Sequence, residues 1–117
     1  MTKDTHMKTA LIQMSCTPNA DDNRARLAEH IAEAAAQGAE LVVLQELHNT
    51  PYFCQVEDTC NFDLAEPIPG PSTAFFGNLA KLHGVVLVTS LFERRAAGLY
   101  HNTAVVFERD GSIAGRY

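Results

Sequence analysis

A run of four apolar residues, Leu41–Leu44, constrains the fold of this chain more than any other segment. A strand that is apolar at every position suits a sheet covered on both faces. Residues 9–14 form a second short apolar run, and between the two runs Leu27, Ile31 and Ala34 recur at helical spacing. These segments predict a right-handed β-α-β unit with parallel strands, whose carboxyl ends open at the same edge of the sheet.

The remainder of the chain predicts a second helix and then three strands. Asp21 or Asp22 is expected to cap the first helix, and Gly38 and Gly84 suit the left-handed positions that close the two helices. The expected boundaries are a helix over 72–83, strands over 85–92, 103–107 and 113–117, and turns at 94–98 and 110–111. The order β-α-β-α-β-β-β predicts an α/β fold with a mixed sheet and both helices on one of its faces.

The length and the strand pattern together bear on domain organisation. At 117 residues the chain has the size of one domain. Its strands read as apolar on both sides, whereas two helices on one face leave the other face without a cover. We therefore expect residues 1–117 to form a single domain that is incomplete by itself, with a partner sheet or further chain over the open face.

Composition excludes several classes of partner. The formal net charge is −5 and the nine basic residues are scattered along the chain, so the electrostatic footprint of a nucleic-acid-binding protein is missing. No apolar run approaches the roughly 20 residues that cross a bilayer, so no membrane partner is expected. Cys16, Cys54 and Cys60 cannot all pair within the chain, and reduced thiols predict a cytoplasmic protein.

Glu46 is the first candidate for chemistry, because it follows the carboxyl end of a buried strand, where ligands of open α/β sheets gather. Leu44, Leu47, Tyr52 and Phe53 are expected to shelter its carboxylate from water. A poorly hydrated carboxylate takes up a proton more readily, as a general base must. Taken alone, a glutamate after a strand is more often a solvated turn residue, and both interpretations stay open.

Cysteine, histidine and asparagine residues give weaker indications. Neither Cys54 nor Cys60 has a base placed by a motif, so structural thiols are favoured over a nucleophile. A zinc site built from His48, Cys54, Cys60 and His101 matches no compact metal motif, and no metal is predicted. Asn102 could either anchor a turn or begin a strand, and a structural use is favoured.

Several short segments are informative because they occur in a fixed order. They are LVVLQEL at 41–47, HNTPYFC at 48–54, PIPGPST at 67–73, LYHNTA at 99–104, DG at 110–111 and GRY at 115–117. In this order they resemble the nitrilase superfamily of carbon-nitrogen hydrolases, and the match extends over nearly all of the chain from Lys8 onward. The resemblance implies the N-terminal part of an α-β-β-α sandwich, in which two sheets stack between layers of helices.

The resemblance also implies a chemistry that depends on a Glu, a Lys and a Cys. In the family the cysteine attacks the amide or carbamoyl carbon, the glutamate moves protons, and the lysine stabilises the oxyanion. Glu46 is the implied general base, and His48, Tyr52 and Phe53 are expected to contact the substrate. No cofactor is implied.

The loop that follows Glu46 is similar to that of N-carbamoylputrescine amidases. This similarity implies a small carbamoyl or amide substrate, and specifically the hydrolysis of N-carbamoylputrescine to putrescine in polyamine biosynthesis. Family members pair through a helix face, so a homo-oligomer is expected for the complete form.

The sequence departs from the family where the other two catalytic residues belong. The lysine of the family follows the Gly-Arg-Tyr segment by two positions and the cysteine comes later, so both are expected beyond Tyr117. We therefore expect residues 1–117 to be inactive alone. The alternative is a non-catalytic binding or assembly module that pairs with a complete homologue or with a separate C-terminal half. A flavodoxin-like binder is the weakest reading, because no phosphate loop is present.

Overall fold

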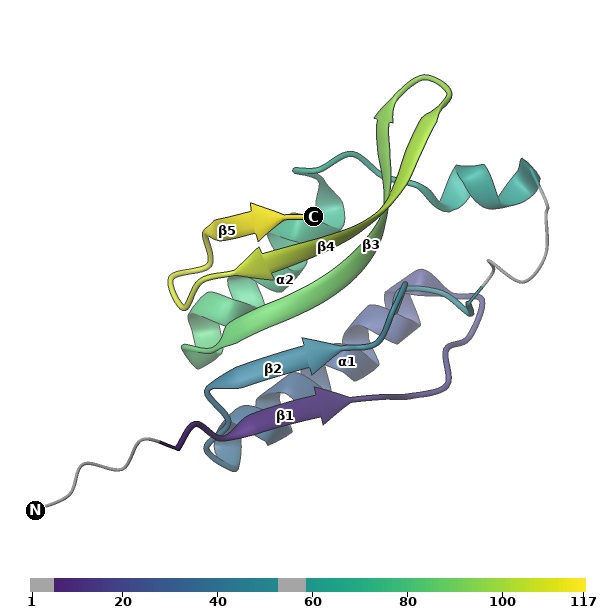
Figure 1. Cartoon of the computed structure of the whole chain (residues 1–117). Coiled ribbons are helices and arrows are strands. Elements are labelled where there is room, and N and C mark those ends of the chain that lie inside the picture. Colours follow the sequence, from purple (N-terminus) through teal and green to yellow (C-terminus); the bar gives the residue numbers. More distant parts are fainter. Residues whose placement is uncertain (1–5, 53–58) are drawn as a thin grey trace, which may run out of the picture.

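The computed structural model describes residues 6–52 and 59–117, which form one mixed sheet and two long helices (Figure 1). The elements in chain order are β1 (Thr9–Ile12), α1 (Ala20–Ala36), β2 (Leu41–Leu44), the 3-10 helix η1 (Thr59–Leu64), α2 (Pro71–His83), β3 (Val86–Ala96), β4 (Leu99–Phe107) and β5 (Ile113–Arg116). The predicted α/β class and the order β-α-β-α-β-β-β are confirmed, with η1 added between β2 and α2.

The sheet keeps its strands in chain order, β1-β2-β3-β4-β5. The pairs β1·β2 and β2·β3 are parallel, because α1 and α2 carry the chain back between them. The pairs β3·β4 and β4·β5 are antiparallel and need only short turns. Since β3 continues well beyond the end of β2, the residues after Leu44 lie beside the middle of β3.

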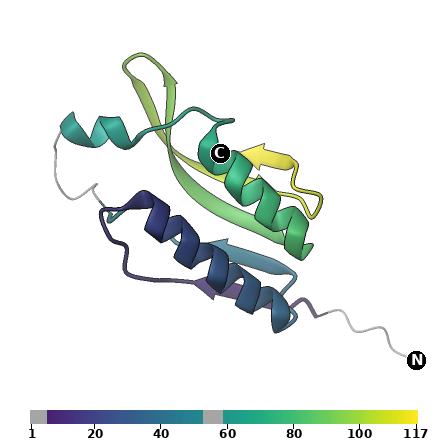
Figure 2. The same cartoon turned by 180° about the vertical axis from the view of Figure 1, so that it is seen from behind.

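Both helices pack on the same face of the sheet (Figure 2). Leu27 and Ile31 of α1 and Phe76 and Ala80 of α2 are fully buried. Beneath them lie the strand residues that face the helices, which are Val42, Leu44, Leu87, Leu91, Val105 and Phe107. Each fully buried valine, leucine, isoleucine or phenylalanine side chain contributes roughly 1.5–3 kcal/mol, so this core holds the described elements together.

The opposite face of the sheet is apolar and partly open. Val43 pairs with Leu11 on one side and with Val88 on the other, and Val88 pairs with Val106. The three valines are only partly buried and Leu11 is 79% exposed. Within residues 6–52 and 59–117, α1 and α2 leave this face uncovered, which is the face for which the strand pattern predicted a cover.

The helix ends follow the predicted chemistry with one correction. Asn19, and neither Asp21 nor Asp22, caps α1, because its side chain accepts a hydrogen bond from the Asp22 backbone at 3.1 Å. Gly84 closes α2 in the left-handed conformation, with a φ of 63°, as predicted.

The turn predicted over 94–98 is wrong, because most of this segment is strand. Glu93 and Arg94 pair with His101 and Tyr100, so β3 and β4 extend as a hairpin beyond the other strands (Figure 1). Phe62 of η1 stacks on Tyr100 with ring centres 4.5 Å apart and supports the hairpin. The extension was not predicted because the charged run at residues 93–95 does not show the apolar alternation of a strand.

Candidate active site

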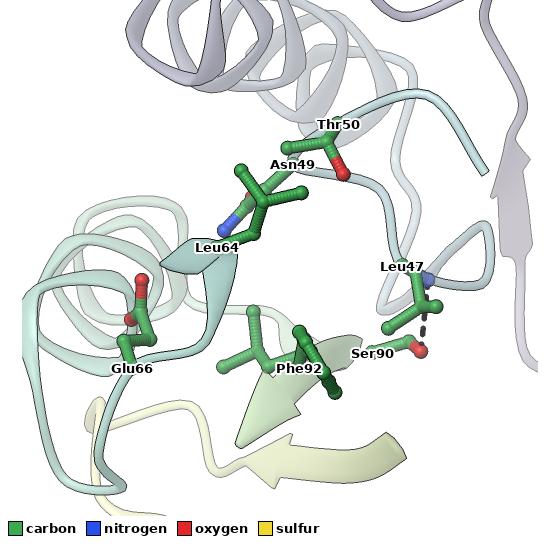
Figure 3. A pocket seen from close by; sticks show the side chains of 8 residues that line it. Leu47, Asn49, Thr50, Leu64, Glu66, Ser90 and Phe92 are labelled. Atoms are coloured by element: carbon green, nitrogen blue, oxygen red, sulfur yellow. Dashed lines mark hydrogen bonds between the residues drawn. The ribbon is translucent and has the colours of Figure 1, made fainter. Parts of the chain in front are cut away.

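Glu46 lies at the carboxyl edge of the sheet, two residues after the end of β2. The next residue, Leu47, has a positive φ of 48°, which is uncommon for a residue other than glycine. The Leu47 side chain is buried in the core, and its backbone N–H donates to Ser90 Oγ of β3 at 3.0 Å (Figure 3). The sharp turn after β2 is therefore tied to the neighbouring strand.

The carboxylate of Glu46 is held by a side chain from β4, the strand on the far side of β3. Asn102 Nδ2 of β4 donates to Glu46 Oε1 at 2.5 Å. Ser90 Oγ in turn donates to Asn102 Oδ1 at 3.2 Å. We call the Leu47 N–H, Ser90, Asn102 and Glu46 the Glu46 network, and it joins the segment after β2 to interior positions of β3 and β4.

The predicted shelter around Glu46 is wrong for the described residues, because the side chain is exposed. Leu44 belongs to the core beneath the helices and Leu47 is also buried, yet the Glu46 side chain beside them stays exposed. Tyr52 is 48% exposed, and Phe53 lies outside the described residues. In this structure the Glu46 carboxylate is oriented by a hydrogen bond, and apolar side chains do not shelter it from water.

The segment after Glu46 is also fastened to the connection between β1 and α1. Cys16 Sγ donates to the His48 carbonyl at 3.1 Å. The fully buried Asn23 donates to the Asn49 carbonyl at 2.9 Å and to the Thr17 carbonyl at 2.6 Å. These bonds fix the backbone of residues 48–49 relative to the sheet edge.

A small cavity lies behind this loop (Figure 3). Its volume is about 20 Å³, which is enough for one water molecule and too small for an organic substrate. Ser90 and Glu66 contribute polar groups to its wall, and Glu66 also accepts from the backbone N–H of Ser72 at the start of α2, at 2.7 Å. The cavity is therefore no candidate for the substrate pocket.

His48 lies in the core and not at the surface. Its ring has no exposed area and packs edge to face against Phe76, with ring centres 4.9 Å apart. Burial lowers the pKa of His48 to about 4, and the nearby Asn49 amide, which opposes this shift, does not reach hydrogen-bond geometry. The imidazole is neutral at pH 7, and the prediction that it contacts substrate gains no support from this position.

The remaining cysteines and histidines form no second site in the described part of the chain. Cys16 is a free thiol, and burial raises its pKa, which makes it a poor nucleophile. The side chains of Cys54 and Cys60 lie outside the described residues. Among the residues that are described, no three His, Cys, Asp or Glu side chains gather as metal ligands. None of the described helices combines the length and apolar character needed to cross a membrane.

Sequence reasoning missed the polar partners of Glu46. Asn102 lies within β4 opposite Phe92, and not in a turn or at a strand start. Ser90, opposite Ala104, gave no signal at all, because a serine on the open face of a strand is unremarkable in sequence. Asn102 stands between His101 and Thr103 in the sequence, so its polarity did not set it apart, and only the strand register connects it with Glu46.

Comparison with known proteins identifies relatives of this fold and sequence. The family model described as carbon-nitrogen hydrolase matches residues 8–117. Citrullinase of Francisella tularensis is 35% identical over 96% of this chain and 39% of its own length. N-carbamoylputrescine amidase of Solanum lycopersicum is 37% identical over 98% of this chain and 38% of its own length. Human omega-amidase NIT2 is 35% identical over 97% and 40%, respectively.

Solved structures agree with these sequence matches. A carbon-nitrogen hydrolase from Helicobacter pylori G27 superposes with a TM-score of 0.89 at 43% identity, over 95% of this chain and 38% of that one. Saccharomyces cerevisiae Nit3, a member of branch 10 of the nitrilase superfamily, gives a TM-score of 0.80 at 29% identity, over 95% and 43%. The chain thus spans about two fifths of the length of these proteins, and the nitrilase-like fold of that portion is confirmed.

Proposed function

Because this chain belongs to the carbon-nitrogen hydrolase family through residues 8–117, we propose that it supplies the general base of an enzyme that hydrolyses an amide or carbamoyl C–N bond. The observation that carries the proposal is the position of Glu46. Its carboxylate stands at the carboxyl edge of the parallel strands, where such sheets bind ligands, and a hydrogen bond from Asn102 gives it a defined orientation.

In the proposed reaction, Glu46 takes the proton from the thiol of a cysteine as the sulfur attacks the substrate carbonyl carbon. The tetrahedral intermediate collapses, and Glu46 returns the proton to the leaving nitrogen. Glu46 then activates a water molecule that hydrolyses the thioester. A lysine ammonium stabilises the oxyanion in both halves of the reaction.

We assign the lysine and the nucleophilic cysteine to sequence other than residues 1–117. Residues 1–117 alone are therefore proposed to be inactive, because Cys16 is a protonated thiol engaged with the His48 carbonyl. Activity is proposed for the polypeptide that combines this region with the remaining part of the family domain, as a homo-oligomer in the cytoplasm.

The proposed substrate is N-carbamoylputrescine, which is hydrolysed to putrescine, carbon dioxide and ammonia as a step in polyamine biosynthesis. Support comes from the loop 47–54 and from the Solanum lycopersicum relative named for this activity. Relatives of similar identity are named citrullinase and omega-amidase. All three names concern a terminal carbamoyl or amide group, so this group is the common feature of the proposed substrate class.

The test is ammonia release by the polypeptide expressed from its complete gene, measured with N-carbamoylputrescine, citrulline and a terminal ω-amide. We expect N-carbamoylputrescine to give the highest kcat/KM and residues 1–117 alone to give no turnover. A preference for citrulline or the ω-amide would refute the substrate, and a lack of activity with every terminal amide or carbamoyl compound would refute the hydrolase.

A second candidate function is an assembly module, and the open apolar sheet face around Leu11 favours it. In this case residues 1–117 would pair with a complete homologue or with a separately encoded C-terminal half. The nucleotide sequence after the Tyr117 codon separates the candidates. An open frame with a lysine two codons on and a later cysteine motif supports the enzyme, and a stop codon at this point supports the module.

A further inference from the structure

We infer that Ser90 and Asn102 are positioning residues that hold the Glu46 carboxylate in one orientation for proton transfer. The inference rests on the proposed role of Glu46 as the base. Three hydrogen bonds in series carry it: Leu47 N–H to Ser90 Oγ at 3.0 Å, Ser90 O–H to Asn102 Oδ1 at 3.2 Å, and Asn102 N–H to Glu46 Oε1 at 2.5 Å. The series starts at the backbone next to Glu46 and returns to the Glu46 side chain, so it closes a ring.

The hydroxyl of Ser90 determines which end of the Asn102 amide faces Glu46. A serine hydroxyl has one proton, and here the oxygen accepts from Leu47 while the proton goes to Asn102 Oδ1. The carbonyl end of the amide therefore points at Ser90, and the NH₂ end points at Glu46. A reversed amide would place its oxygen against a carboxylate oxygen, which repels it, and would leave the Ser90 proton against a donor.

The backbone at the start of the ring is strained, and Ser90 contributes to holding it. Leu47 has a φ of 48° and places its side chain in the core. A non-glycine residue keeps such a conformation only where its surroundings fix it. The bond from its N–H to Ser90 is one of those constraints, so Ser90 acts both on the backbone beside Glu46 and, through Asn102, on the carboxylate.

The strand register keeps the two positioning residues together. Ser90 pairs with Ala104 and Phe92 pairs with Asn102, so Ser90 and Asn102 are diagonal neighbours on the open face of β3 and β4. The antiparallel ladder on both sides of them fixes their separation independently of Glu46. Ser90 and Asn102 therefore provide a rigid platform to which the exposed Glu46 side chain is attached.

The two carboxylate oxygens of Glu46 would therefore have different roles in the reaction. Oε1 accepts from Asn102, and Oε2 is left as the oxygen that exchanges the proton. The proton of the attacking thiol moves to Oε2, and the same proton leaves on the departing nitrogen, so Glu46 ends the acylation half as a carboxylate. Because these hydrogen bonds are open to water, each one is weak. Their contribution to catalysis is to orient Oε2 toward the reacting atoms.

The test compares variants in the polypeptide expressed from its complete gene. Asn102→Asp keeps the shape of the side chain but replaces the donor with a second carboxylate, and Ser90→Val removes the hydroxyl. We expect each to lower kcat by about 10-fold or more, with KM changed by less than about twofold. Ser90→Thr restores the hydroxyl and is expected to return kcat to within about twofold of the wild type. Asn78→Asp, an equal charge change at an exposed site of α2, serves as the control.

A second readout does not depend on turnover. In the NMR spectrum of the polypeptide expressed from its complete gene, one of the two Asn102 side-chain amide protons is expected to lie downfield of the other because Glu46 accepts it. Ser90→Val should collapse this difference and Ser90→Thr should keep it. An Asn102 signal that is the same in the wild type and in Ser90→Val overturns the inference.

Glu46→Gln separates failure of the inference from failure of the proposed function. Loss of turnover in Glu46→Gln together with wild-type kcat in Asn102→Asp and Ser90→Val would leave the base in place and overturn the positioning role. Wild-type turnover in Glu46→Gln itself would refute the assignment of Glu46 as the base, and with it the positioning role of Ser90 and Asn102.

Discussion

The side-chain nitrogen of Asn102 lies 2.5 Å from Oε1 of Glu46, although 56 positions of sequence separate the two residues. The β3-β4 hairpin accounts for the contact. It carries the chain away from the sheet edge and returns it so that Asn102 faces the end of β2. The only charged side chain proposed for chemistry in this chain is thus oriented by a strand that comes much later in the sequence.

Acidification is expected to destabilise the fold through His48. Burial lowers its pKa from 6.5 to about 4, so the unfolded chain binds a proton that the folded chain excludes. Stability from this residue is complete above about pH 6.5 and is lost as the pH falls toward 4, by roughly 3 kcal/mol in total. Urea unfolding of wild type and His48→Leu at pH 7.5 and 4.5 measures this contribution.

His48→Leu should lose this part of the pH dependence, and His30→Gln, at an exposed position of α1, should keep it. Equal loss of stability on acidification in the wild type and in His48→Leu would show that the buried imidazole is not the source.

Asn23→Ala is expected to destabilise the protein by about 1–3 kcal/mol, because it leaves partly buried backbone groups without their side-chain partner. The Asn23 side chain accepts from the Thr17 N–H at 2.9 Å and donates to the carbonyls of Thr17 and Asn49. The same change should increase hydrogen exchange in residues 47–50. Chemical unfolding and hydrogen-exchange mass spectrometry test the two parts, with Asn78→Ala on the surface of α2 as the control.

A stable Asn23→Ala variant with wild-type exchange in residues 47–50 would mean that the loop after Glu46 is held by other contacts. The bond from Leu47 to Ser90 would then be the main remaining restraint.

Gly77→Ala is expected to destabilise the protein by about 1–3 kcal/mol, whereas a glycine-to-alanine change inside a helix ordinarily stabilises by about 1 kcal/mol. The reversal has a steric cause, since a Cβ at Gly77 would lie 2.8 Å from the carbonyl oxygen of Gly111 in the β4-β5 turn. Thermal unfolding of Gly77→Ala beside Asn78→Ala tests it. A raised Tm for Gly77→Ala would show that α2 and the turn are less closely packed than described.

Much of the fold was predictable because the helix-facing residues repeat regularly. The apolar runs and the helical spacing of Leu27 and Ile31 gave the element order, the mixed sheet and the side on which the helices pack. The hairpin extension was not predicted because Glu93 is a charged residue. It is buried only because polar side chains bind its carboxylate. Arg95 Nη2 lies 2.9 Å from this carboxylate and Thr103 donates to it at 2.8 Å. Such pairs depend on cross-strand register, which composition does not reveal.

The candidate site was only half predictable for a related reason. Glu46 follows a buried strand. A residue at the carboxyl end of such a strand lies at the sheet edge, so its place could be predicted without knowing the other strands. Its hydration depends on which way Leu44 and Leu47 turn, and both face the core. Its partners, Ser90 and Asn102, come from strands whose alignment with β2 is set by packing over the whole sheet.

The measurement that tests the account most directly is the turnover of Glu46→Gln in the polypeptide expressed from its complete gene. Gln keeps the size of the side chain and an oxygen for the Asn102 amide, but it cannot act as a base. We expect kcat/KM for ammonia release to fall by at least about 100-fold, while Glu33→Gln at an exposed position of α1 stays at the wild-type value. Turnover of Glu46→Gln within about twofold of the wild type would contradict the assignment of Glu46 as the base.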